Sequence, residues 1–197
     1  MDCGRMLPRG RRLLLFFAGL LCAAQQPAGP RILRPLDNSV VEKGPLSIIA
    51  KSSGDGELKL DGQPLTAAKP ANGVLTATVE PKEGPHELVL TTGGADYKIR
   101  FHVGASAPAD WKNYRSHPPI AVECTTCHSA SGGQWALKEE VAGPSCMTCH
   151  DAATFPKAHT HKPEELEECQ MCHNPHGSTA SRHLIMTKEV ACKQCHG

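Results

Sequence analysis

The sequence predicts two domains of different construction: a small all-β sandwich, and then a loop-rich module with short helices that is organised around bound groups. Residues 31–104 contain no cysteine, and short strand-like runs alternate there with turn signals. Residues 117–197 contain eight cysteines and few Leu, Ile, Val or Phe side chains, which are too few for a core of their own. The length of 197 residues suits one or two small domains.

Residues 1–24 have the features of a secretory signal peptide. A segment with four arginines precedes the apolar run Leu13–Leu21, and small residues then predict cleavage after Ala24. An uncleaved membrane anchor is disfavoured because this run is too short to span a bilayer. Lipid attachment at Cys22 is disfavoured because the preceding leucine is large. We therefore expect a periplasmic or extracellular protein with no stable membrane span in the mature chain and a short N-terminal tail, residues 25–30.

Cysteine usage agrees with export. Two of the ten cysteines, Cys3 and Cys22, lie in the predicted signal peptide, and the other eight belong to one repeated motif. No cysteine is then left for a structural disulfide or a free thiol. Removing residues 1–24 also deletes four Arg and one Asp, which leaves 17 basic and 19 acidic residues. This balance offers no basic patch, so we expect no nucleic-acid partner.

Residues 31–104 are predicted to form an antiparallel sandwich of six or seven short strands. In the last run the apolar side chains alternate, which places Tyr97, Ile99, Phe101 and Val103 on one face. Pairs such as Asp61-Gly62 mark the turns between runs. The runs are Ile32–Leu36, Leu46–Ala50, Glu57–Leu60, Val74–Val79, Glu87–Leu90 and Tyr97–Val103.

The stretches LKLDGQPL and GVLTATVEPKEGPHELVL resemble bacterial immunoglobulin-like domains. The resemblance covers residues 31–104 and implies an immunoglobulin-like β-sandwich with a docking, spacing or assembly role. Two histidines lie here, His86 at a turn and His102 on the polar face of the last run. Both are expected to be solvated; the alternative is that one of them reaches a group bound in the other domain.

Residues 105–116 are predicted to be a linker, because the segment begins with Ala, Ser and Pro residues. Trp111 and Tyr114 lie in it. Two interpretations stay open for these aromatic residues: they pack on the first group bound by the next domain, or they simply fill the junction between the domains.

Residues 117–197 carry the pattern Cys-x-x-Cys-His four times. This pattern is the attachment signature of haem c, in which both thiols add to the haem vinyl groups and the following histidine binds the iron. The sequence therefore predicts four covalently bound haem c groups. The cysteines are Cys124, Cys127, Cys146, Cys149, Cys169, Cys172, Cys192 and Cys195, and the proximal histidines are His128, His150, His173 and His196.

Other uses of paired cysteines fit less well. Zinc sites do not require a histidine directly after every second cysteine. A thioredoxin-like redox pair needs a strand–helix context that this segment lacks. Simple disulfides are possible in an oxidising compartment, but they do not account for the four histidines.

The motifs form two paired units, residues 117–158 and 159–197, each of which opens with His-x-Pro. They resemble multihaem cytochromes c with doubled Cys-x-x-Cys-His motifs. The second unit, with HKP, CQMCHNPHGS and CKQCH, is the closer match, and the first has Ser131 where the second has His176. The resemblance implies a haem-organised module, in which the haem faces form the core and the chain wraps them in short helices and loops.

Each iron needs a sixth ligand, and five histidines outside the motifs are candidates: His117, His159, His161, His176 and His183. Similarity to the small tetrahaem cytochromes c3 implies His117 for haem 1, His161 for haem 3 and His176 for haem 4. Haem 2, on the second motif, has no matching residue. Its candidates are His159 and His183, with Met186 less favoured because histidines are in surplus.

Ligation by two histidines disfavours substrate binding and favours electron transfer. We therefore expect an electron carrier rather than an enzyme. Its redox partner proteins would be a membrane quinol-linked donor and a terminal reductase or outer-membrane conduit. One alternative is a small multihaem reductase with an open site at haem 2, and another is a haem-bearing assembly subunit of a larger redox complex.

Overall fold

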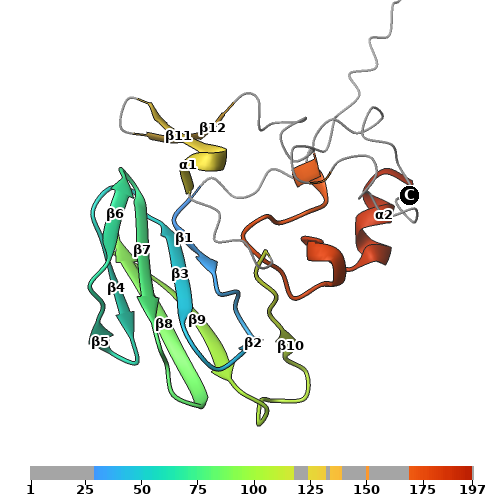
Figure 1. Cartoon of the computed structure of the whole chain (residues 1–197), viewed down its shortest axis with the longest axis horizontal. Helices are drawn as coiled ribbons and strands as arrows, with labels where there is room; N and C mark the ends of the chain where they lie inside the picture. Colours follow the sequence, from blue (N-terminus) through green and yellow to red (C-terminus); the bar gives the residue numbers. More distant parts are fainter. Residues whose placement is uncertain (1–28, 118–123, 132–133, 139–149, 151–168, 197) are drawn as a thin grey trace, which may run out of the picture.

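The computed structural model of the chain describes residues 29–117, 124–131, 134–138, 150 and 169–196. The predicted signal peptide, Cys146, Cys149, His159 and His161 lie outside these residues. Ten strands form two packed sheets, and the described elements of the C-terminal part lie beside them (Figure 1). The strands are β1 (Arg31–Arg34), β2 (Ser39–Val41), β3 (Leu46–Lys51), β4 (Gly56–Leu60), β5 (Gln63–Pro64), β6 (Ala68–Ala71), β7 (Val74–Val79), β8 (Gly84–Thr92), β9 (Ala95–Val103) and β10 (Lys112–Asn113).

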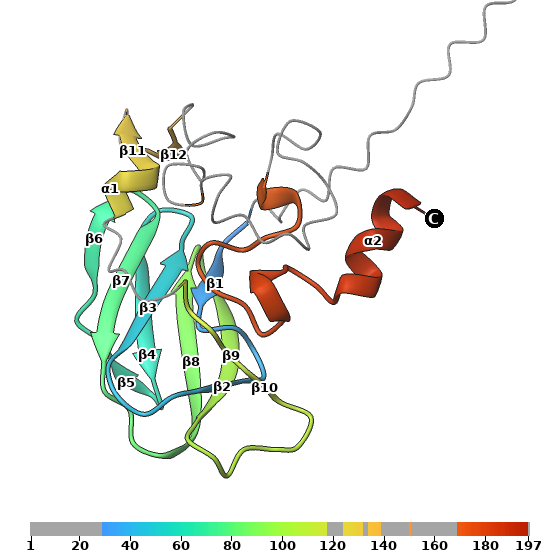
Figure 2. The ribbon, with the colours of Figure 1, turned by 45° about the vertical axis from the view of Figure 1, so that its right-hand side comes forward.

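The two sheets have the strand orders β1-β3-β7-β6 and β10-β2-β9-β8-β4-β5. In the first sheet, β1 pairs with β3 in an antiparallel manner. In the second sheet, β2 pairs in parallel with its neighbour β9. Taken in chain order, the first sheet corresponds to strands ABED of an immunoglobulin domain, and β4, β8 and β9 correspond to strands CFG. Figure 2 shows the two layers facing each other. The predicted immunoglobulin-like sandwich is confirmed.

Alternating apolar side chains from both sheets fill the space between the layers. Phe101 and Val103 are fully buried, and Tyr97 and Ile99 pack against the same cluster, as their alternation predicted. Burying one such side chain contributes about 1.5–3 kcal/mol. The sandwich therefore has a side-chain core of its own. The other fully buried aliphatic side chains are Ile48, Leu58, Leu75, Leu88 and Leu90.

All six predicted runs are strands, and the sequence missed β2, β5, β6 and β10. These strands have four residues or fewer, and β6 contains a proline and is mostly exposed. Strands this short leave little periodic signal, and a proline within a strand weakens that signal further. β10 pairs in parallel with β2, so the end of the predicted linker extends the second sheet.

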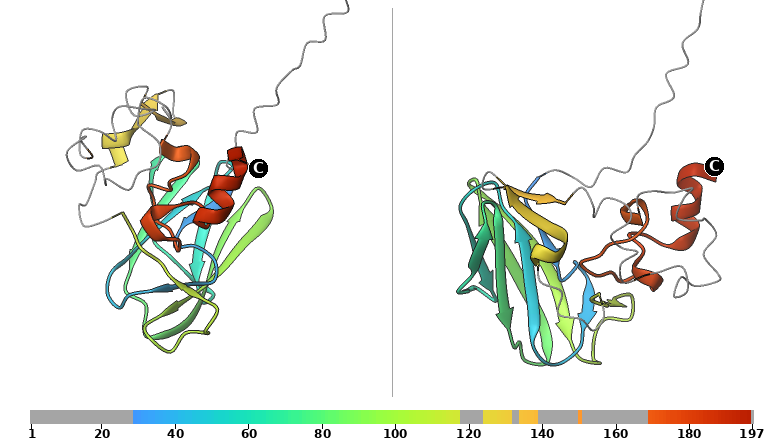
Figure 3. Two further views of the ribbon diagram at one scale, coloured as in Figure 1. Left: turned by 90° about the vertical axis from the view of Figure 1, so that its right-hand side faces the viewer. Right: turned by 45° about the horizontal axis from the view of Figure 1, so that its top comes forward.

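The described elements of the C-terminal part are short, and Figure 3 shows them beside the sandwich. Every residue of the buried apolar cluster that the structure describes lies between Ile32 and Tyr114. The part of the chain that the structure describes contains no helix with the length and apolarity needed to cross a bilayer. The elements are α1 (Cys124–Cys127), β11 (His128–Ser131), β12 (Gln134–Leu137), η3 (Cys169–Met171), η4 (Ser181–His183) and α2 (Lys188–His196).

Candidate haem-binding centre

The first and third Cys-x-x-Cys-His motifs lie at single helical turns, and the fourth lies within the nine-residue helix α2. Cys124 and Cys127 are the first and last residues of α1, and residues three apart on a helix share a face. In the third motif, the backbone N–H groups of Cys172 and His173 both donate to the carbonyl of Cys169, at 3.2 and 3.0 Å. Such a turn presents both sulfur atoms to one flat group and places the following histidine beside it.

His128 and His176 bring the first motif into contact with the second repeat unit. Their ring centroids are 6.1 Å apart, and their ring planes differ by only 2°. Two imidazoles on opposite sides of one metal ion, each bonded at about 2.0 Å, place their centroids roughly 6 Å apart. The two rings therefore have the separation of a pair of axial ligands.

His176 is largely buried, and its surroundings keep it neutral. Burial, followed by the charges of His128, Arg34 and Arg31, lowers the pKa of His176 to about 4. The imidazole is therefore neutral at pH 7, which is the form that binds a metal. Both arginines belong to β1, and Nε of Arg34 is buried without a hydrogen-bond partner among the described residues. The sandwich thus brings positive charge close to this histidine.

The loop that carries His176 is fixed to the end of the sandwich. The Tyr114 hydroxyl donates to the His176 carbonyl at 2.5 Å, and the His176 N–H donates to Oδ1 of Asn174 at 3.0 Å. Arg115 and Ser178 exchange two backbone hydrogen bonds of 2.9 Å. Gly177 has a φ of 125°, and a Cβ there would collide with the Tyr114 hydroxyl. The position of His176 is therefore set from outside its own repeat unit.

His117, His150 and His183 form a second group of imidazoles. The centroid of His117 is 5.9 Å from that of His150, at an interplanar angle of 72°, and 6.0 Å from that of His183, at 52°. Burial, followed by the charge of His150, lowers the pKa of His117. Burial, followed by the charges of His117, His173 and Arg115, lowers the pKa of His183. Nδ1 of His183 is buried without a hydrogen-bond partner among the described residues.

His173 shows how one proximal imidazole is oriented. Its Nδ1 lies 2.8 Å from the carbonyl oxygen of Arg182, and a carbonyl only accepts, so Nδ1 carries the proton and donates. In this tautomer the lone pair is on Nε2, and a metal-bound histidine usually donates from its other ring nitrogen in the same way. Arg182 has a left-handed backbone, with a φ of 57°. Such strain is typical of functional positions, where the surrounding structure must offset it.

The observed neighbours differ from the assignments that the resemblance to cytochromes c3 implied. Those assignments gave His117 to haem 1 and His176 to haem 4. In the structure, His176 lies beside His128 of the first motif, and His117 lies beside His150 of the second. Sequence spacing gave no signal for either contact, because each depends on how distant loops pack.

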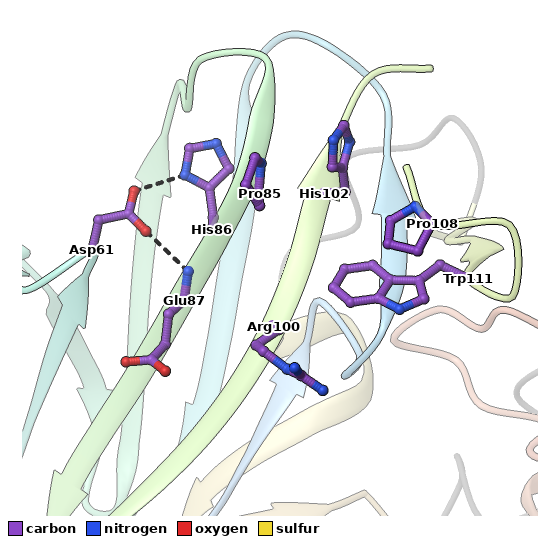
Figure 4. A pocket seen from close by; sticks show the side chains of 8 residues that line it. All are labelled: Asp61, Pro85, His86, Glu87, Arg100, His102, Pro108 and Trp111. Atoms are coloured by element: carbon purple, nitrogen blue, oxygen red, sulfur yellow. Dashed lines mark hydrogen bonds and ion pairs between the residues drawn. The ribbon is translucent and has the colours of Figure 1, made fainter. Parts of the chain in front are cut away.

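The two histidines of the sandwich do not take part in this centre. His86 uses both ring nitrogens: one lies 2.7 Å from Asp61 (Figure 4), and the other lies 2.7 Å from the carbonyl oxygen of Lys82. His102 is only 5% exposed, so the expectation that it is solvated was wrong. The segment after β9 returns past the outer face of the sheet, and Pro108 and Trp111 line a pocket together with His102 (Figure 4). The alternation of side chains within β9 cannot show that a segment later in the chain will cover His102.

Tyr114 belongs to the buried core cluster and contacts the His176 loop, so it fills the junction between the two parts of the chain. Trp111 lies at the surface of the sandwich, with the Arg100 guanidinium 6.0 Å from its ring centroid. Of the two interpretations for these aromatic residues, the junction is the one observed for Tyr114.

The residues present fit haem c. The cysteines of the first and third motifs lie on turns that direct paired sulfur atoms to one side. Three imidazole pairs, two of which share His117, have the separation of axial ligands, and Nδ1 of His173 donates to a carbonyl as in metal-bound histidines. These are the requirements for covalent attachment and axial ligation of haem.

A family model described as the doubled CXXCH motif matches residues 161–197. The matched segment contains the third and fourth Cys-x-x-Cys-His motifs, and such motifs bind haem c covalently. The resemblance to doubled-motif cytochromes is thereby confirmed for the second repeat unit. A comparison with curated protein sequences gives no match.

Three solved structures share features with the sandwich. The fibronectin(III)-like modules of Clostridium thermocellum CbhA are 18% identical, with 38% of this chain and 94% of that chain covered and a TM-score of 0.32. The endo-beta-1,4-mannanase from Thermotoga petrophila is 14% identical, with 42% and 21% covered and a TM-score of 0.32. The IG27 protein domain is 18% identical, with 40% and 97% covered and a TM-score of 0.29. The immunoglobulin-like assignment itself rests on the strand order.

Proposed function

We propose that the chain is an exported tetrahaem cytochrome c that transfers electrons between redox partner proteins through closely packed, mostly bis-His haems. The observation that carries this proposal is the separation within two imidazole pairs, 6.1 Å for His128 and His176 and 5.9 Å for His117 and His150. An iron with two imidazole ligands has no open position for a substrate, which favours electron transfer. Haem c supplies the redox chemistry when bound, while the chain supplies ligands, spacing and charge.

The proximity of the histidine groups supports close haem packing. His117 lies within 6.0 Å of both His150 and His183. His183 follows Arg182, whose carbonyl orients His173 of the third motif. Ligands of the second and third haems are thus separated by only a few side chains, which suits electron exchange between neighbouring haems.

Export follows from the same chemistry, because haem c is attached after the chain has left the cytoplasm. The predicted signal peptide, residues 1–24, supplies the route, and the periplasm or the cell surface is the destination. The proposed partners are a membrane quinol-linked donor on one side and a terminal reductase or outer-membrane conduit on the other. The sandwich, which contacts the His176 loop through Tyr114, would dock or orient the haem module.

The first test is to produce the full chain with a c-type cytochrome maturation system. We expect an intact mass that corresponds to four haems and to the loss of residues 1–24. We also expect low-spin spectra in both redox states and rapid electron exchange with a small redox protein. A mass with fewer than four haems would contradict the count.

Carbon monoxide separates the carrier from a reductase with an open haem 2. In the carrier, the reduced protein binds no carbon monoxide, because every iron has two protein ligands. The position of His117 beside His150 supports this outcome for haem 2. Stoichiometric binding of carbon monoxide at one haem would favour the reductase instead.

A further inference from the structure

We infer that His128 and His176 are the two axial ligands of the same haem iron, so that the first haem joins the two repeat units. The inference rests on the proposed haem attachment and deepens it. It replaces the assignment of His117 to haem 1 and His176 to haem 4 with one in which the second unit supplies the sixth ligand of haem 1. Neither the repeat pattern nor the family match assigns this pair.

Ring geometry carries the first step. The centroid separation of 6.1 Å equals, within a few tenths of an ångström, what two imidazoles on one iron require. His128 directly follows α1, which carries both cysteines of the first motif, so its proximal role is set by the sequence. His176 is then the imidazole that lies at the distance expected of the second axial ligand.

Rigid placement of His176 carries the second step. Its carbonyl accepts from the Tyr114 hydroxyl, its N–H donates to Asn174, and the adjacent Ser178 is paired with Arg115. Ser178 is only 3% exposed. A histidine held on both sides in this way is pre-organised, so little conformational entropy is lost when it binds a metal.

The reassignment also resolves the missing ligand of haem 2. If His176 is the sixth ligand of haem 1, then His117 is no longer needed there. The ring centroid of His117 lies 5.9 Å from that of His150, the proximal histidine of haem 2. The absence of a histidine at Ser131, which matches His176 in the repeat, then leaves no iron without a ligand. His159, His161 and His183 remain for haems 3 and 4.

The decisive experiment uses the full-length, haem-loaded His176→Met variant. A methionine on an iron gives a near-infrared sulfur-to-iron absorption band in the oxidised protein and a strongly upfield-shifted methyl NMR signal in the reduced protein. We expect both signals at one equivalent per chain. Nuclear Overhauser contacts should connect that methyl to the haem whose thioether bridges belong to Cys124 and Cys127.

Two results would overturn the inference. Contacts from the methyl to the haem on Cys192 and Cys195 would restore the assignment implied by cytochromes c3. If the methionine signals are absent, the His176→Ala variant decides: the reduced variant should bind one carbon monoxide per chain. Failure of this variant to bind carbon monoxide would show that His176 is not a ligand.

The matched control is His86→Met, which introduces the same side chain at a histidine of the sandwich. His86 is hydrogen-bonded through both nitrogens, so this variant should keep the spectra of the unchanged protein. If neither His176 variant accumulates with haem, electron paramagnetic resonance of the unchanged protein replaces them. Parallel rings predict a rhombic low-spin signal, and near-perpendicular rings predict one with a large principal g-value. Absence of a rhombic signal would contradict the parallel pair.

Failure of this inference can be distinguished from failure of the proposed function. A pyridine haemochrome assay and the intact mass report haem attachment without reference to axial ligands. A chain without haem would reject both proposals. A chain with four haems in which His176 serves another iron would reject only the ligand pair.

Discussion

The Tyr114 hydroxyl donates a hydrogen bond to the backbone carbonyl of His176, 2.5 Å away and 62 residues later in the chain. Tyr114 belongs to the buried core of the sandwich, whereas His176 lies beside the first Cys-x-x-Cys-His motif. One side chain therefore links the fold of the sandwich to the position of a candidate ligand. The sandwich thus supplies a hydrogen-bond donor to the loop that carries His176.

Replacing Tyr114 with Phe should destabilise this junction. The ring stays in the core, but the His176 carbonyl loses its donor, which costs roughly 1–3 kcal/mol for a buried acceptor. We expect a loss of this size in the free energy of unfolding, measured by urea denaturation of the haem-loaded protein. The control is Tyr97→Phe, at the only other tyrosine of the chain, with an expected change within about 0.5 kcal/mol. Equal losses in the two variants would contradict the role of the hydroxyl.

The same hydroxyl predicts a dependence on alkaline pH. Burial raises the pKa of Tyr114 to about 12, from an ordinary value of 10.0. Above pH 10 the unfolded chain loses this proton before the folded chain does, so stability is present below pH 10 and falls as the pH rises towards 12. The loss should be on the order of 2 kcal/mol. The difference between the unchanged protein and Tyr114→Phe should narrow over this range; a constant difference would contradict the shifted pKa.

Gly177 should be intolerant of a side chain. An alanine there must adopt a φ of 125° and would also collide with the Tyr114 hydroxyl and, at 2.8 Å, with the Arg115 carbonyl oxygen. Gly84 is the matched control, because its φ is 130° and no atom lies within 4 Å of an added Cβ. Backbone strain should cost about 1–3 kcal/mol in both variants. Only Gly177→Ala should also displace His176 and let the reduced protein bind carbon monoxide.

Arg34 should raise the reduction potential of the nearest haem. Its charge lowers the pKa of His176, so it acts on the surroundings of that imidazole, and a cation disfavours the oxidised, more positive iron. Arg34→Gln should lower the midpoint potential of one haem by on the order of 50 mV, which corresponds to about 1 kcal/mol for one electron. Arg100→Gln, on β9, is the control and should leave all four potentials unchanged. Potentiometric titration distinguishes the two variants.

The two parts of the chain should respond differently to the absence of haem. The sandwich has a core of its own, including Ile48 and Phe101, which are fully buried. Residues 117–197 contain few Leu, Ile, Val or Phe side chains, so we expect them to be disordered without haem. Hydrogen exchange of a variant with Ser at all eight motif cysteines should show protected amides only in the sandwich. Protection of α2 in that variant would contradict the prediction.

The sequence by itself determined the architecture and the chemistry of attachment. Alternation in runs such as Tyr97–Val103 sufficed to predict the main strands, because successive side chains of a strand point to opposite faces and the pattern is visible within a few residues. The Cys-x-x-Cys-His motifs were also recognisable from the sequence, because the two cysteines and the histidine are close neighbours in the chain, and α1 carries both cysteines of the first motif. The family match confirms the doubled motif in residues 161–197. The signal peptide and the count of four haems stay predictions.

Only the tertiary structure decided which histidines lie together and what covers them. His102 is buried by a segment that returns past the sheet, and His176 is placed beside His128 by contacts with Tyr114 and Arg115. A repeat pattern records local spacing, whereas these neighbours depend on loops 62 residues apart meeting in space. Axial ligation needs two imidazoles on opposite sides of one iron, and that is a property of packing between segments. The pairing of axial ligands therefore cannot be predicted from the sequence of either segment alone, because it depends on where the two segments lie relative to each other.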